Sequence, residues 1–288
     1  QSAPRATRAG LVGALLVGLF ALVTALRPPK VSTALATHEE IERARKIIAL
    51  QANPDANFAL TGDKSLLFSD NGSAFLMYRV QARSWIVLGD PVGSPSETAQ
   101  LAWEFVDAAS AANARPVFYQ VGPTNLGLWA EMGLAIHKMG EEAIVNLASF
   151  SLEGNHRKKL RTAHNRAGRD GLSFEILAAP VDDGTMDVLR QISDQWLQDK
   201  RSSEKQFSVG RFEPEYLRQF PIAVVRHDKR IVAFANVMTT GLKEAATIDL
   251  MRHVDDAPSG LMNYLFTDLI LHLKKEGFSE FSLGMAPL

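Results

Sequence analysis

The feature that most limits the possible fold is an order of secondary structure that the chain shows twice. Residues 85–121 and residues 246–283 each read as a strand, a loop that contains Pro-Ser, a helix and a second strand. A hairpin is predicted before each copy. The two copies share little sequence identity, so the repetition is one of architecture. It predicts an α/β (α+β) protein built from two similar units in tandem.

Each predicted hairpin leads into the strand of its own unit. In the first unit Asn71-Gly72 separates two apolar runs, and Asn-Gly supplies the positive φ angles of a tight turn. A hairpin followed by a strand, a helix and a parallel strand is the order of the GCN5-related acyltransferase (GNAT) fold. We therefore predict GNAT-like domains at 31–150 and 173–288, joined by a basic linker helix at 151–172. The second domain is the one predicted to be catalytic.

An uncharged apolar run precedes both units. Residues 9–26 carry no charged side chain, and the run is just long enough to span a bilayer. It ends at Arg27-Pro28, which is typical of a stop followed by a turn. We predict a transmembrane helix with its flanks at 1–30, with a signal peptide or a buried helix as the alternatives. Basic residues on both sides leave the orientation open.

Composition excludes some classes of protein and says little about others. The chain has 31 Lys and Arg against 32 Asp and Glu, so its net charge does not indicate a general nucleic-acid binder. Cysteine is absent, which excludes disulfides and thiolate chemistry and suits a cytosolic body. The chain begins at Gln1 and stops in an apparent strand and its exit loop. We expect a longer protein, with further active-site residues beyond Leu288.

Two charges of opposite sign stand in an otherwise apolar predicted strand. Asp249 and Arg252 lie three residues apart, and residues three apart in a regular strand point to opposite faces. Both side chains reach one site only if the strand bulges or ends between them. The alternative is an ion pair at a strand end, with Arg252 paired to Asp255 or Asp256.

The most basic part of the chain is a predicted helix at about 155–168. Lys158, Arg161 and Arg169 share one face of this helix through i, i+3 and i+4 spacing, and Arg166 adds to the charge. Such a face suits the phosphates of a nucleic acid or of a lipid head group. The alternative is a solvated linker helix with no partner.

Further candidates lie in a polar segment and at a helix start. Residues 205–216 contain a Gly turn and end at Tyr216, which faces a cleft or packs in the core. The helix that follows Asp249 begins near a Ser-Gly pair whose free N–H groups suit a phosphate or carbonyl oxygen. The histidines show no metal-ligand spacing, so no metal site is predicted. The substrate-binding residues predicted outside the basic helix are Lys205, Arg211, Ser259 and Gly260.

Several of these segments together resemble one family. The runs NPDANFALTGDKSLLFS, HRKKLRTAHNRAGRDG, KQFSVGRFEPEYL and ATIDLMRH resemble the C-terminal domain of the MprF family, from about residue 38 to 288. These are bacterial phosphatidylglycerol lysyltransferases, also called aminoacyl-phosphatidylglycerol synthases. The resemblance implies transfer of Lys or Ala from aminoacyl-tRNA to a hydroxyl of phosphatidylglycerol, which reduces the negative charge of the membrane surface. It implies no cofactor or metal, because the tRNA ester is already activated.

The resemblance also implies roles for particular residues. Asp249 and Arg252 fall on the family's catalytic Asp-x-x-Arg motif, and Tyr216 follows its Gly-Arg-Phe motif. Arg252, or N–H groups of the loop before the last helix, would stabilise the oxyanion. Asp249 would bind the substrate amine, orient Arg252 or accept the hydroxyl proton. We favour the first two roles, because an aspartate paired with an arginine has a lowered pKa and is a poor base. The basic-helix residues would bind tRNA or the lipid phosphate.

The resemblance places the protein in the bacterial inner membrane, with residues after about 30 in the cytosol. A homo-oligomer through the membrane part is a further expectation. Two alternatives remain at this point. One is a coenzyme-A-dependent N-acetyltransferase, although the loop HVDDAPSGLM lacks the usual Gly pattern and is acidic. The other is a non-catalytic module that binds nucleic acid or anionic membrane.

Overall fold

The computed structural model describes residues 10, 12–19, 33–200 and 203–288. The chain divides into two units, residues 1–32 and residues 33–288. In the first unit residues 12–19 are helical, and the remainder of the predicted membrane segment lies largely outside the described residues. Among the described residues no helix has both the length and the apolar character needed to cross a membrane.

The first half of the larger unit contains a sheet with the strand order β1-β2-β3-β5 and the short β4 paired to β2. The predicted Asn71-Gly72 hairpin is confirmed, since β1 and β2 are antiparallel and Gly72 has a φ of 74°. Helix α3 connects β3 to β5, which are parallel, as the repeated order predicts. The elements are β1 (Ser65–Phe68), β2 (Ala74–Gln81), β3 (Ser84–Leu88), β4 (Val92–Gly93), α3 (Pro95–Ala111), β5 (Arg115–Tyr119), η2 (Pro123–Asn125) and α4 (Leu126–Glu131).

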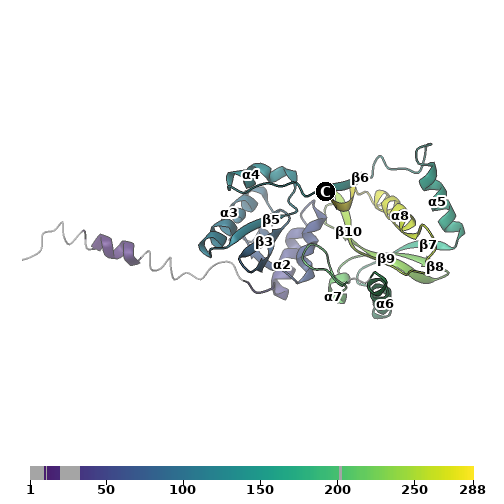
Figure 1. Cartoon of the computed structure of the whole chain (residues 1–288), viewed down its shortest axis with the longest axis horizontal. Coiled ribbons are helices and arrows are strands. Elements are labelled where there is room, and N and C mark those ends of the chain that lie inside the picture. The colour runs from purple at the N-terminus through teal and green to yellow at the C-terminus, as the bar shows by residue number, and fades with distance from the viewer. Residues whose placement is uncertain (1–9, 11, 20–32, 201–202) are drawn as a thin grey trace, which may run out of the picture. The chain divides into compact units, whose positions relative to one another are not determined.

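The second half repeats this order in a larger sheet. Its strands run β6-β11-β10-β9-β8-β7, and α8 connects the parallel strands β10 and β11. Helices α8 and α5 cover one face of the sheet and α6 covers the other (Figure 1). The two tandem units of the predicted fold are therefore present. The elements are β6 (Gly140–Asn146), α5 (Lys158–Arg169), β7 (Leu172–Leu177), α6 (Asp183–Asp199), α7 (Pro214–Leu217), β8 (Ile222–His227), β9 (Arg230–Thr239), β10 (Ala245–His253), α8 (Leu261–Lys275) and β11 (Glu280–Pro287).

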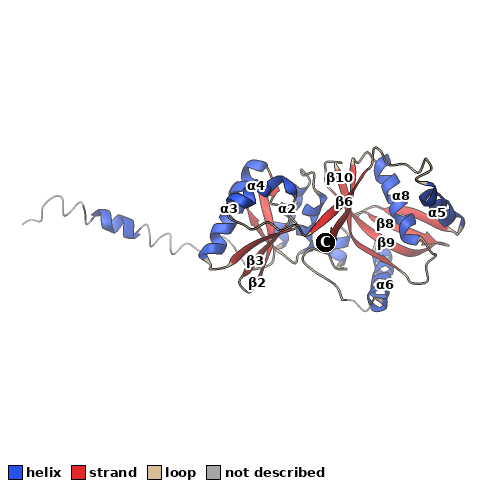
Figure 2. Cartoon of the chain, turned by 45° about the horizontal axis from the view of Figure 1, so that its top comes forward, coloured by secondary structure: helices blue, strands red, loops and turns tan. Residues whose placement is uncertain are grey.

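One strand that precedes the predicted domain boundary at residue 150 belongs to the sheet of the second half. Strand β6 precedes that boundary, yet it pairs antiparallel with β11 at the edge of the second sheet (Figure 2). Without β6 the edge of β11 would expose unpaired N–H and C=O groups, which proteins usually cover. The basic helix α5 also differs from a free linker, because its His164 bonds to Asp268 of α8 at 3.1 Å.

The N-terminal segment of the larger unit ties the two sheets together. It consists of α2 (His38–Ile48), which starts with a capping box at Thr37, and η1 (Pro54–Thr61). Helix α2 ends at Ile48, and the Asn53 side chain then caps η1 by accepting the Asp55 N–H. The Asn57 side chain donates to the carbonyl oxygens of Pro54 at 2.8 Å and of Thr239 in β9 at 3.0 Å. The buried core consequently runs without a break from the first sheet to the second.

We expect Asn57→Ala to lower the free energy of unfolding by about 2 kcal/mol, because it removes two hydrogen bonds and leaves a buried carbonyl oxygen unpaired. Chemical denaturation of the chain measures the change. Gln100→Ala is the control: its side chain bonds to Glu104 on the exposed face of α3, and we expect an effect within about 0.5 kcal/mol. Equal, small effects in both variants would contradict the bridging role of Asn57.

Candidate active site

Strand β10 bulges where the spacing of its charges predicts. Ile248 pairs with Val237 of β9 and Met251 pairs with Ala235, so Asp249 and Leu250 together face the single residue Asn236. The Asn236 side chain is fully buried, and its Oδ1 accepts the Leu250 N–H at 2.7 Å. This bond satisfies an amide that the bulge removes from the regular ladder. The predicted break between Asp249 and Arg252 is confirmed.

A cavity opens beside the bulge because β10 and β11 separate. The two strands pair only at Ala245 and Ala246, where β10 begins. Beyond that point a cavity of about 450 Å³ lies between them and the first sheet. Both sheets contribute to its wall, which includes Met77, Leu88, Thr247, Asp249 and Met285. Asp249 is thus carried to a space that substrate atoms can enter.

Asp249 is held by two donors from one segment of chain. Its Oδ1 accepts the Gly210 N–H at 2.8 Å, and its Oδ2 accepts the Tyr216 hydroxyl at 2.9 Å. The approach is so close that a Cβ on Gly210 would lie 2.0 Å from Asp249 Oδ2. Only glycine therefore fits at position 210 with Asp249 in this place.

The protonation of Asp249 differs from the sequence-based expectation. Burial raises the pKa of this carboxyl above its usual value, although the bonds from Gly210 and Tyr216 and the charges of Lys64 and Arg252 oppose the rise. The expectation of a lowered pKa assumed a direct pair with Arg252. The ion pair of Arg252 is instead with Glu204, so the desolvation of Asp249 dominates.

Tyr216, for which the sequence left a cleft position and core packing open, is packed in the core and reaches Asp249. It lies at the core of the second half, 2% exposed, and its hydroxyl points to the carboxylate. Burial, with the nearby charge of Asp249, raises the pKa of the phenol well above its usual value. The hydroxyl therefore keeps its proton and acts as a donor.

Arg252 lies on the other side of the bulge, away from the cavity wall. Its guanidinium carbon stands 4.3 Å from the ring centroid of Trp196, and its nitrogens donate to the Met251 carbonyl at 3.0 Å and to Glu204 at 3.4 Å. The alternative pairing with Asp255 or Asp256 is not found; Asp256 pairs with Arg230. Glu204 also accepts the Phe212 N–H at 3.2 Å. Arg252 is therefore linked to the chain segment that clamps Asp249.

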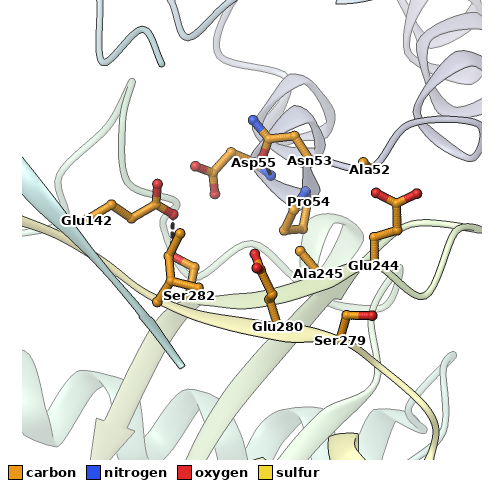
Figure 3. Close-up of a pocket in the computed structure, with 11 residues that line it drawn as sticks. Ala52, Asn53, Pro54, Asp55, Glu142, Glu244, Ala245, Ser279, Glu280 and Ser282 are labelled. Carbon is orange, nitrogen blue, oxygen red and sulfur yellow. Dashed lines mark hydrogen bonds between the residues drawn. The ribbon is translucent and has the colours of Figure 1, made fainter. Parts of the chain in front are cut away.

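A second cavity of about 500 Å³ adjoins the first and is acidic. The two cavities share Asn53, Asp55 and Glu142. Figure 3 shows the carboxylates of Asp55 and Glu142 pointing toward one another, and Glu244 and Glu280 also line this cavity. Sequence reasoning missed these four carboxylates, because they come from four segments far apart in the chain and share no spacing. Only the pairing of β6 with β11 brings Glu142 there.

Asp55 titrates unusually within this acidic wall. Burial by the surrounding protein, with the charges of Glu142 and Asp249, raises the pKa of Asp55 from 3.8 to about 6. The side chain itself still faces solvent in the cavity. The cavity thus concentrates negative charge that a cationic ligand would neutralise.

The predicted residues of α5 do not line either of these cavities. Arg161 bonds to the carbonyl oxygens of Leu152 and Gly154, and Arg166 pairs with Asp170 at 3.2 Å. Lys158 and Arg169 are exposed. The proposed phosphate-binding role of this helix stays a prediction.

The remaining predicted binding residues are also spread out. Lys205 is exposed, and Arg211 pairs with Glu213 at 3.1 Å. Gly260 starts α8 with a φ of 88° and lines a small separate cavity after β10, and Ser259 precedes it. Within the described ranges, no group of three or more His, Asp or Glu side chains is arranged to hold a metal ion.

Comparison with known proteins finds close relatives. A family model described as phosphatidylglycerol lysyltransferase, C-terminal, matches residues 45–288. The phosphatidylglycerol lysyltransferase of Bacillus subtilis (strain 168) is 35% identical over 290 residues, which are 100% of this chain and 34% of that protein. The enzyme of the same name from Staphylococcus aureus (strain MSSA476) is 33% identical over 280 residues, 96% of this chain and 33% of that protein. The chain spans about a third of the length of these curated relatives.

Solved structures agree in fold. A C-terminal domain from Agrobacterium fabrum, whose parent protein carries the provisional name lysylphosphatidylglycerol synthetase, is 46% identical with a TM-score of 0.85, covering 87% of this chain and 79% of that one. L-PGS from Bacillus licheniformis is 34% identical with a TM-score of 0.84, covering 90% of this chain and 81% of that one. FemX shares the fold alone, at 9% identity and a TM-score of 0.56, covering 88% of this chain and 89% of that one.

We expect Gly210→Ala to displace Asp249 and to lower the free energy of unfolding by about 1–3 kcal/mol, because the added methyl overlaps the carboxylate. Gly127→Ala in α4 is the matched control, since nothing lies within 4 Å of its added Cβ. Denaturation of both variants measures the difference. A Gly210→Ala chain as stable as Gly127→Ala would show that the clamp on Asp249 is loose.

We expect Asp55→Asn to stabilise the chain at neutral pH but not near pH 4. Between about pH 4 and pH 6 the folded state binds more protons at Asp55 than the unfolded state, so the stability of the unchanged chain falls as pH rises through this range. The asparagine variant avoids that loss of stability. Solvent in the cavity screens the charge of Asp55 and makes the loss smaller than full burial would. Denaturation at several pH values measures it. Asp187→Asn, at an exposed position of α6, controls for the lost charge; a gap independent of pH would contradict the raised pKa.

Proposed function

The chain belongs to the phosphatidylglycerol lysyltransferase C-terminal family, and we propose that it carries the transfer site of an aminoacyl-tRNA-dependent phosphatidylglycerol aminoacyltransferase. The enzyme moves an aminoacyl group, Lys or Ala, from aminoacyl-tRNA to a hydroxyl of phosphatidylglycerol. The observation that carries this proposal is the clamped carboxylate of Asp249 at the wall of a cavity between two acyltransferase-type units.

The charge of the adjoining cavity supports an aminoacyl substrate. Every aminoacyl ester has an α-ammonium, and a lysyl ester has a second cation on its side chain. The carboxylates of Asp55, Glu142 and Glu280 complement such a group. The same charges oppose the pyrophosphate of coenzyme A, so the N-acetyltransferase alternative is not favoured.

The reaction needs a proton acceptor near the attacking hydroxyl. The lipid hydroxyl oxygen bonds to the ester carbonyl carbon, the carbon–oxygen bond to the tRNA ribose breaks, and the lipid proton passes to the leaving ribose oxygen. A carboxylate with a raised pKa takes and returns a proton more readily than an ordinary aspartate. We therefore assign the proton transfer to Asp249, in place of the amine-binding role expected from sequence.

Tyr216 holds Asp249 directly, and Arg252 holds the chain segment that contains Gly210. The protonated Tyr216 hydroxyl fixes one carboxylate oxygen and leaves its remaining lone pair to the substrate. Arg252 holds Glu204, which in turn holds the Phe212 N–H. The guanidinium is already engaged outside the cavity, so the geometry gives no support to a direct oxyanion contact by Arg252.

The other expected partners remain part of this proposal. The exposed Lys158 and Arg169 of α5 would contact phosphates of the tRNA or of the lipid surface. We place the protein at the bacterial cell membrane with residues after about 30 in the cytosol. Association of copies through the membrane part depends on residues mostly outside the described ranges.

We expect Asp249→Asn to lower transfer at least about 100-fold while the chain stays folded, because it removes the proton acceptor and keeps the shape. The assay follows labelled amino acid from charged tRNA into extracted lipid, with the intact protein in membranes. Glu175→Gln, a charge change at the outer strand β7, is the control and should leave transfer unchanged.

Two outcomes would contradict the proposal at different points. Ordinary transfer by Asp249→Asn would overturn the role of this residue. Absence of lipid labelling by the unchanged protein with both lysyl- and alanyl-tRNA would overturn the function itself. Circular dichroism of each variant separates either result from loss of folding.

A further inference from the structure

A buried ion pair in the first half of the chain is not used by the chemistry described above. Asp63 and Lys64 follow η1, and the Lys64 side chain is 1% exposed. Its Nζ donates to Asp63 Oδ1 at 2.5 Å and to Thr61 Oγ1 at 2.8 Å. The free energy needed to remove two charges from water often exceeds the free energy gained from their attraction. A buried ion pair is therefore weak evidence for a stabilising role. Its position calls for another explanation.

The second oxygen of Asp63 reaches a distant part of the chain. Asp63 Oδ2 accepts the N–H of Phe207 at 2.8 Å, across 144 residues of sequence. Phe207 has a φ of 78°, a backbone conformation that residues other than glycine rarely adopt. Its ring lies 6.3 Å from that of Tyr119 and 5.9 Å from the Lys64 nitrogen. Both members of the ion pair thus contact a residue whose backbone needs to be held.

The residue held in this way stands next to the clamp on Asp249. Gly210, three positions after Phe207, donates its N–H to Asp249 Oδ1. Three residues span at most about 11 Å, so a displacement at Phe207 is carried to Gly210. Lys64 also bears on the same carboxylate, because its positive charge favours the ionised form of Asp249.

We propose that Asp63 and Lys64 are positioning residues that fix Phe207 and thereby hold the Gly210 N–H against Asp249. The first half of the chain then does more than complete the cavity wall: it sets the orientation of the reacting carboxylate in the second half. This role rests on the proposed function, since it concerns the same carboxylate, but its first test is independent of catalysis.

The first test measures the segment itself. The double variant Asp63→Asn/Lys64→Met removes both charges at nearly constant volume, and Glu175→Gln/Arg226→Met removes a cross-strand pair between β7 and β8 as a control. We expect amide hydrogen exchange at 207–211 to rise at least about tenfold in the first variant only, with α8 unchanged in both. Unchanged exchange at 207–211 would overturn the proposal.

The second test separates positioning from general stability. In the lipid-transfer assay we expect kcat of the Asp63→Asn/Lys64→Met variant to fall about 10- to 100-fold, with KM for aminoacyl-tRNA changed by less than about twofold. A changed melting temperature with normal kcat would show that the pair serves stability alone and overturn the proposal. Inactivity of the unchanged protein would refute the proposed function, while the exchange result would still decide the positioning role.

Folding of the double variant is controlled separately. If it does not fold, the single change Asp63→Asn, which retains an oxygen able to accept the Phe207 N–H, replaces it in both measurements. We expect amide hydrogen exchange at 207–211 to rise in the single variant too, but by less than in the double variant. If neither variant folds, the ion pair is a requirement of folding, and the positioning role is overturned.

Discussion

The structure around the site follows from the need to keep one carboxylate partly out of water. Asp249 leaves the ladder of β10 at a bulge, and a half-buried carboxylate requires donors. Gly210 and Tyr216 supply them, which holds the segment 203–216 against the bulge of β10. The segment is held at a further place by Glu204 and Arg252. Several polar contacts of the second half therefore bear on a single side chain, directly or through the segment that holds it.

The two halves repeat one architecture and use it differently. In the first sheet β3 and β5 stay paired along five positions, from Ser84 to Leu88. In the second sheet β10 and β11 pair at two positions and then separate, which opens the cavity. The first half contributes walls, acidic groups such as Asp55 and the contact through Asp63. The proposed reacting carboxylate thus stands in the second half, and the first half encloses the cavity beside it.

Local patterns in the sequence predicted the repeated order, the hairpins and the bulge between Asp249 and Arg252. Each of these depends on residues close in sequence, where turn chemistry and strand periodicity act. The pairing of β6 with β11, the acidic cavity and the pKa of Asp249 were not predicted. They arise from contacts between distant segments, and no local pattern records them. The direction in which the pKa of Asp249 shifts depends on whether burial or the charge of Arg252 has the larger effect. The folded structure is needed to determine which of the two it is.

The pairing of β6 with β11 also has a consequence for how the chain is made. Gly140 lies opposite Pro287, so the edge of the second sheet closes only after the residues up to Pro287 have left the ribosome. The contact of Asn57 with Thr239 spans a still longer stretch of sequence. Non-local contacts of this kind slow folding and leave apolar surface exposed for longer. During synthesis from the N-terminus, the first half is therefore made before the strands of the second half, and the common core forms only when those strands are present.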